Sequence, residues 1–166
     1  MKTLQEFLDK LAIRESNGNY KAVNRFGYIG KYQMGEASLI DCGYYRKSNN
    51  RYNNDWSGVF IGKDGVYSLE DFLNNSIAQE NAIRKYMSCQ WRYLKALNLQ
   101  KYTGKQINGF VITKSGMLAG AHLKGAKAVA DYLNSNGKNI SKDGFGTSIE
   151  AYMKNFANYQ VDEICR

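Results

Sequence analysis

The sequence contains no proline and no apolar run that approaches the ~20 residues of a membrane-spanning helix. A chain without proline has no rigid proline-rich spacers, which favours a compact helical protein. Because no apolar run is long enough to cross a membrane, we also expect a protein that does not insert into one. Its 166 residues suit a single domain with a hydrophobic core, spanning residues 1–166.

Cysteine and histidine are also scarce. The three cysteines, Cys42, Cys89 and Cys165, are far apart and have no CxxC spacing, which argues against a zinc site. One disulfide with one free thiol, or three reduced thiols, both fit this pattern. Any Ser-His or Cys-His catalytic arrangement would need the single histidine, His122, and no GxSxG motif supports one. We expect neither a metal nor a cofactor.

Charge is the strongest bulk property that is present. The formal net charge of +8 favours an anionic partner, such as nucleic acid, an anionic membrane or an anionic cell-wall polymer. The basic residues are spread along the chain without a long run, and no zinc-finger or RNA-binding motif occurs. The sequence therefore disfavours nucleic acid as the partner.

The first segment predicts a helix over residues 2–16 that ends on a carboxylate. Apolar residues recur there at helical spacing, at Leu4, Leu8 and Leu11, and the next position on this stripe is Glu15. Burial disfavours the charged form of a carboxyl group, and a carboxylic acid that keeps its proton can act as a general acid. The alternative is a structural glutamate that is hydrogen-bonded or paired with a basic residue such as Arg14.

Polar and glycine residues follow Glu15 directly, as Ser16, Asn17, Gly18 and Asn19. These residues favour the end of a helix and the start of a loop. We therefore expect Glu15 to be buried on its helix side and open on its loop side.

The rest of the chain predicts a mainly α (α+β) protein with a small β or irregular lobe after the first helix. Glu80 lies on the apolar stripe of one predicted helix, where a structural hydrogen bond is the favoured interpretation. Ser68 is expected to cap that helix and Thr147 or Ser148 the last one. The predicted elements are a hairpin or glycine-rich loop at 24–35, a short helix at 36–42, an exposed loop at 46–67 with a strand at 59–61, and helices at 68–97, 115–134 and after 148.

Four features that follow one another along the chain indicate a known family. They are Glu15-Ser16 at a helix end, the segment GKYQMG at 30–35, the small-residue segment AHLKGA at 121–126, and Tyr152 on a late helix. This order resembles the lysozyme-like superfamily, and within it the lytic transglycosylases and goose-type lysozymes. In the third segment, His122 and Leu123 stand where that family has tyrosine and asparagine.

The resemblance implies a lysozyme-like helical domain that cleaves the MurNAc–GlcNAc β-1,4 bond of peptidoglycan. It implies that Glu15 is the general acid/base and that Tyr152 is its neighbour in the catalytic site. By the same resemblance the substrate-binding residues are Ser16, Tyr32, Gln33, Met34 and His122. The positive charge agrees with docking on anionic glycan strands of peptidoglycan.

Two routes from Glu15 to a product stay open. Hydrolysis normally needs a second carboxylate, whereas lytic transglycosylases use the 6-hydroxyl of the sugar as the nucleophile and form an anhydro product. Candidates for a second carboxylate are Asp41, Asp55, Asp64, Glu80 and Asp143, and no spacing selects one. A non-catalytic module that binds cell-wall carbohydrate is the alternative function, and a helical nucleic-acid-binding domain is a third, supported by charge alone.

The first residues predict an amphipathic helix and not a signal peptide. We therefore expect the protein to act in the periplasm or at the cell wall of a target bacterium, after export by a specialised secretion system or release by phage lysis. An effector injected into a rival cell would need an immunity protein as a partner in its producer.

Overall fold

The computed structural model describes residues 1–166, which form seven α-helices and two small antiparallel sheets. The predicted mainly α (α+β) class is therefore confirmed. The chain packs as two compact units, which we call the N-terminal unit (residues 9–86) and the C-terminal unit (residues 1–8 together with 87–166). The single domain expected over residues 1–166 stays a prediction.

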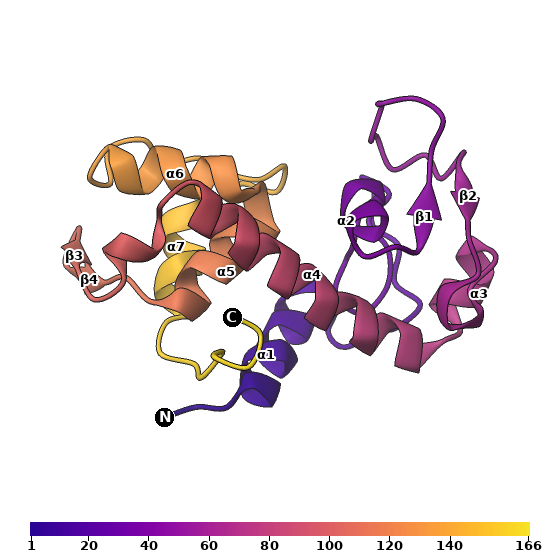
Figure 1. Ribbon diagram of the computed structural model, residues 1–166, viewed down its shortest axis with the longest axis horizontal. Coiled ribbons are helices and arrows are strands. Elements are labelled where there is room, and N and C mark those ends of the chain that lie inside the picture. The colour runs from indigo at the N-terminus through magenta and orange to yellow at the C-terminus, as the bar shows by residue number, and fades with distance from the viewer. The chain divides into compact units, whose positions relative to one another are not determined.

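The N-terminal unit contains the small β lobe predicted after the first helix. Its two strands pair antiparallel, with Tyr45 opposite Phe60, and a short helix lies beside them (Figure 1). The unit comprises the second part of α1 (Leu4–Ser16), α2 (Glu36–Asp41), β1 (Tyr45–Arg46), β2 (Val59–Phe60), a 3-10 turn (Lys63–Gly65), α3 (Leu69–Leu73) and the first part of α4 (Ser76–Ala96).

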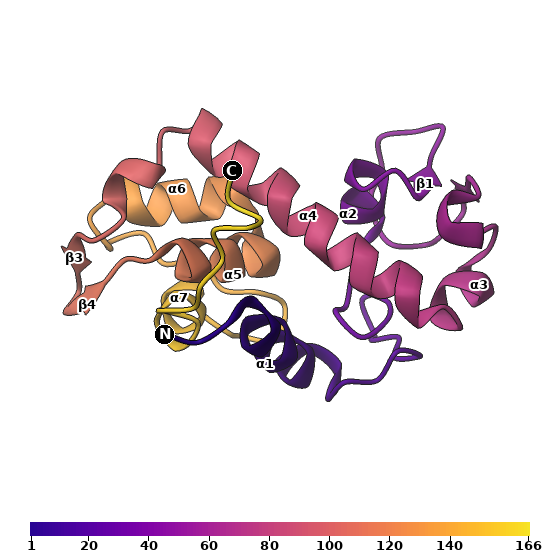
Figure 2. The same cartoon turned by 60° about the horizontal axis from the view of Figure 1, so that its bottom comes forward.

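The C-terminal unit is built around one small-residue helix, which lies between two others in Figure 2. Gly116 lies on this central helix, and Met153 lies on the last helix of the chain. A Cβ atom added at Gly116 would come within 2.7 Å of the Met153 carbonyl oxygen, so glycine allows these two helices to approach closely. The unit contains the rest of α4, a 3-10 turn (Gln100–Tyr102), β3 (Gln106–Ile107), β4 (Phe110–Val111), the central α5 (Lys114–Lys124), α6 (Ala126–Asn134) and α7 (Ile149–Asn155).

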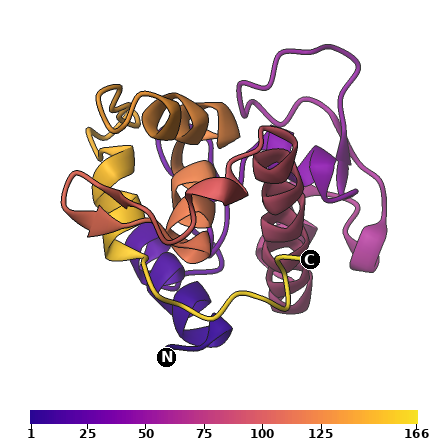
Figure 3. The same ribbon diagram turned by 60° about the vertical axis from the view of Figure 1, so that its left-hand side comes forward.

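The two ends of the chain meet inside the C-terminal unit. The yellow C-terminal segment passes beside the N-terminal residues in Figure 3, where the Gln160 amide donates to the Lys2 carbonyl at 2.7 Å. Phe7 is fully buried there and packs against Phe156 and Tyr159, with both ring centroids 5.7 Å away. The start of α1 therefore belongs to the core of this unit.

Two predicted helices are each divided in the structure. The helix expected over 68–97 breaks after Leu73, where Asn74 caps α3. Ile77, which the helical spacing would place on the apolar stripe of one continuous helix, falls in the first turn of α4 and is 72% exposed. The helix expected over 115–134 breaks at Gly125, whose φ of +91° does not fit a right-handed helix.

The helix caps agree with the sequence. The Ser68 hydroxyl accepts a hydrogen bond from the Asp71 amide, and that of Ser148 accepts one from the Ala151 amide. None of the helices combines the length and apolarity that a membrane span requires. All three cysteines are free thiols in the structure.

Candidate active site

Glu15 is the penultimate residue of α1 and is half-buried, as its position at the end of the apolar stripe predicts. The stripe itself is fully buried, with Leu8 and Leu11 at 0% exposure. The helix ends here because Asn17 and Gly18 adopt the left-handed conformation, with φ of 56° and 78°. Glu15 is therefore fixed at the end of the helix and only partly buried.

Ser16 ties the end of α1 to the glycine-rich segment, by which we mean residues 24–35. Its hydroxyl donates to the Lys31 carbonyl at 2.6 Å and accepts from the Asn19 amide at 3.0 Å. This hydroxyl is used inside the fold, so Ser16 positions the residue before it. Its predicted contact with substrate stays a prediction.

The glycine-rich segment folds back on itself and is held by close backbone contacts. Ile29 and Met34 exchange backbone hydrogen bonds at 3.0 and 2.8 Å, and the Gly30 amide donates to the Ala22 carbonyl at 2.7 Å. A Cβ atom at Gly30 would lie 2.5 Å from Oε1 of Gln79, which itself accepts from the Lys31 amide at 2.8 Å. Only glycine fits this contact without a shift.

The three predicted substrate residues on this segment are buried. Tyr32 is 1% exposed, Gln33 7% and Met34 2%. The Gln33 side-chain amide donates to the Gly30 carbonyl at 3.0 Å, within a left-handed turn at φ of 51°. These three side chains are buried inside the fold, so they offer little surface to a substrate.

Glu80 is the centre of a polar cluster in the N-terminal unit. Its carboxylate accepts hydrogen bonds from the Tyr20 hydroxyl at 2.7 Å, the Lys31 ammonium at 2.7 Å and the Tyr32 hydroxyl at 2.5 Å. Partial burial opposes ionisation of Glu80, but the bonds from Lys31, Tyr32 and Tyr20 outweigh it and lower the pKa of Glu80. Glu80 is thus a structural carboxylate, in line with the interpretation favoured from the sequence.

The lowered pKa of Glu80 predicts a specific acid dependence of stability. Because the pKa is lower in the folded state, the cluster contributes stability above the unfolded glutamate pKa of about 4.3 and loses it as pH falls through the folded value. The unfolding free energy of wild type should exceed that of Glu80→Gln at pH 6, and the gap should shrink below about pH 4. Chemical denaturation at several pH values measures it, and a gap independent of pH would contradict the assignment.

Other candidates for a second carboxylate also serve the fold. Aspartates that accept hydrogen bonds from the protein are Asp55 from Lys47, Asp64 from the Tyr44 hydroxyl, and Asp143 from the Phe145 and Thr147 amides. Asp41 is exposed at the C-terminal end of α2. The second carboxylate of a hydrolytic route is therefore not selected by these contacts.

Tyr152 and His122 belong to the C-terminal unit, whereas Glu15 belongs to the N-terminal unit. Tyr152 is 2% exposed and packs against Phe156 at a centroid distance of 5.0 Å. His122 is half-buried in the last turn of α5. Tyr152 is a core aromatic of its unit, and the roles of these two residues beside Glu15 stay predictions.

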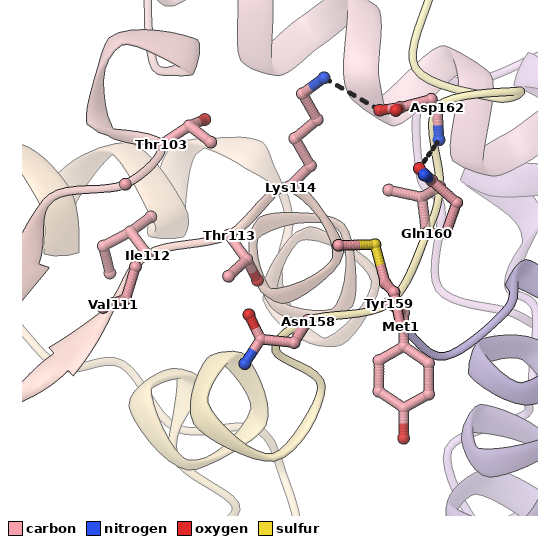
Figure 4. Close-up of a pocket in the computed structure, with 12 residues that line it drawn as sticks. Met1, Thr103, Val111, Ile112, Thr113, Lys114, Asn158, Tyr159, Gln160 and Asp162 are labelled. Atoms are coloured by element: carbon pink, nitrogen blue, oxygen red, sulfur yellow. Dashed lines mark hydrogen bonds and ion pairs between the residues drawn. The ribbon is translucent and has the colours of Figure 1, made fainter.

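The C-terminal unit also contains a pocket of about 250 Å³ (Figure 4). Its lining includes Val111, Ile112, Asn158 and Val161, and the Lys114 ammonium bonds to Asp162 at 3.1 Å at its edge. None of the predicted site residues lines it.

No protein-family model matches this chain, and no curated protein or solved structure is significantly similar to it.

Proposed function

We propose that this chain cleaves the glycan strands of bacterial peptidoglycan at the MurNAc–GlcNAc β-1,4 bond, with Glu15 as general acid/base. The observation that carries the proposal is the half-buried residue Glu15 at the end of α1, beside Ser16, whose hydroxyl bonds to the Lys31 carbonyl of the glycine-rich segment at 2.6 Å.

The chemistry needs one group that gives and then takes a proton. Breaking a glycosidic bond requires a proton on the leaving oxygen, and a carboxylic acid placed beside that oxygen can supply it. Once ionised, the same carboxylate can accept the proton of the attacking hydroxyl. That hydroxyl belongs to the 6-position of the sugar in lytic transglycosylation, or to water in hydrolysis, where a second carboxylate would normally act together with Glu15.

The charge distribution supports an anionic polymer as substrate. The C-terminal unit contains 12 Lys and Arg against 6 Asp and Glu, whereas the N-terminal unit contains 11 against 9. Most of the net charge of +8 therefore lies in the C-terminal unit. Such a surface raises the local concentration of an anionic polymer, and added salt weakens this attraction.

The setting that fits this activity is the periplasm or the cell wall of a target bacterium. Export by a specialised secretion system, or release by phage lysis, would bring the protein there. In the first case the producing cell would need an immunity protein that blocks the site.

Digestion of purified sacculi tests the proposal. We expect soluble muropeptides, whose ends are identified by mass spectrometry: a reducing muramic acid shows hydrolysis, and an anhydro end shows transglycosylation. Sacculi that bind the protein in a pelleting assay but release no fragments would contradict cleavage and support the alternative of a non-catalytic wall-binding module.

A further inference from the structure

Two neighbouring residues of α4, Gln79 and Glu80, bind the same two residues of the chain that follows Glu15. Gln79 binds their backbone, because its Nε2 donates to the Tyr20 carbonyl at 2.9 Å and its Oε1 accepts from the Lys31 amide at 2.8 Å. Glu80 binds their side chains, through the Tyr20 hydroxyl and the Lys31 ammonium group. Tyr20 and Lys31 are thus each connected twice to α4.

The Gln79 side chain is enclosed by the fold and fully paired. It is 1% exposed, and its Nε2 also donates to the Phe72 carbonyl at 2.9 Å, so both donors of the side-chain amide are used. Gly30 lies against it with φ of +81°, and a Cβ atom there would come within 2.5 Å of Oε1. A buried amide whose donors and acceptor are all paired has one favourable orientation.

The path from Gln79 to Glu15 is short. Lys31, whose amide donates to Gln79, accepts through its carbonyl from the Ser16 hydroxyl at 2.6 Å, and Ser16 follows Glu15 directly. Tyr20, whose carbonyl accepts from Gln79, lies in the loop that leaves this end of α1. The end of α1 is therefore connected to α4 by two routes, both within the N-terminal unit.

We propose that Gln79 is a positioning residue for Glu15: it holds residues 17–31 against α4 and so keeps the general acid/base in a fixed place and orientation. This inference rests on the proposed cleavage of peptidoglycan. A catalytic group must be held within about 0.5 Å of its productive position by residues that are themselves fixed by packing and hydrogen bonds. A misplacement of about 1 Å can cost about 10²-fold in rate, even when the change is far from the reacting atoms.

The test compares Gln79→Met with wild type on soluble, uncross-linked peptidoglycan strands. Methionine is similar in length and volume, makes none of the three hydrogen bonds of Gln79 and leaves the net charge unchanged. We expect kcat to fall by about 10–10²-fold. KM should change by less than about three-fold, because the buried Gln79 side chain offers no surface to the substrate.

Leu39→Ala is the matched control for lost stability. Leu39 is fully buried in α2, so alanine there destabilises the same unit without removing a side-chain hydrogen bond. At a temperature at which all variants are folded, Leu39→Ala should keep the wild-type kcat. The carboxyl carbon NMR signal of Glu15, assigned by its absence in Glu15→Gln, should shift in Gln79→Met and stay in place in Leu39→Ala.

An unchanged kcat in folded Gln79→Met, an equal fall in Leu39→Ala, or an unmoved Glu15 signal would overturn the role of Gln79 and leave the proposed cleavage standing. No release of muropeptides by wild type would instead remove the proposed cleavage, and this role with it. Where Gln79→Met does not fold, Ser16→Ala interrupts the same path at the Lys31 carbonyl. A fall in kcat of Ser16→Ala then supports the role, whereas a wild-type kcat or a raised KM alone overturns it.

Discussion

Glutamine in place of Glu15 should abolish cleavage of cell walls and leave the fold intact. The amide is nearly the same size as the carboxylic acid but can neither deliver a proton to the leaving oxygen nor accept one afterwards. Loss of a general acid or base typically costs about 10²–10⁴-fold in rate. The decline in turbidity of a wall suspension measures this loss.

Glu70→Gln provides the matched control for this experiment. Glu70 is an exposed glutamate in the first turn of α3, in the same unit as Glu15, and its replacement removes the same charge. This variant should keep wild-type activity. Circular dichroism and thermal midpoints of both variants should match wild type, so that a loss of activity in Glu15→Gln is assigned to chemistry. Wild-type activity in a folded Glu15→Gln protein would remove Glu15 from the mechanism.

Alanine in place of Gly27 should have the largest effect on stability within the glycine-rich segment. Gly27 has φ of +81°, and a Cβ atom there would lie 2.4 Å from the Asn54 carbonyl oxygen and 2.8 Å from the Asn54 Cβ. The left-handed conformation costs alanine about 1–2 kcal/mol, and overpacking against a backbone atom costs about 1–3 kcal/mol more. We expect a loss of about 2–5 kcal/mol in unfolding free energy, measured by denaturant titration.

Gly18→Ala separates the two causes. Gly18 has a similar φ of +78°, but nothing lies within 4 Å of its added Cβ. It should lose only the conformational part, about 1–2 kcal/mol. Equal losses in Gly18→Ala and Gly27→Ala would show that the contact between Gly27 and Asn54 does not constrain the segment.

Periodic features of the chain could be predicted from the sequence. The stripe of Leu4, Leu8 and Leu11 is buried and places Glu15 half-buried at the helix end, because helical spacing alone decides which face turns inward. The same spacing predicts that Glu80 faces inward, and the structure gives it three hydrogen-bond partners. The mainly α class follows from the same signal.

Features without periodicity could not be predicted. Asn74 and Gly125 divide predicted helices because local capping and backbone conformation override a continuous apolar stripe. The three partners of Glu80 come from loop residues that lie about 50–60 positions earlier in the chain, and no spacing rule connects them.

The most direct test of the central claim is the amount of soluble muropeptide that equal quantities of folded wild-type and Glu15→Gln protein release from the same sacculi. The account predicts fragments cut at the MurNAc–GlcNAc bond from wild type and almost none from Glu15→Gln. Equal release by the two proteins, or no release by wild type, would contradict it.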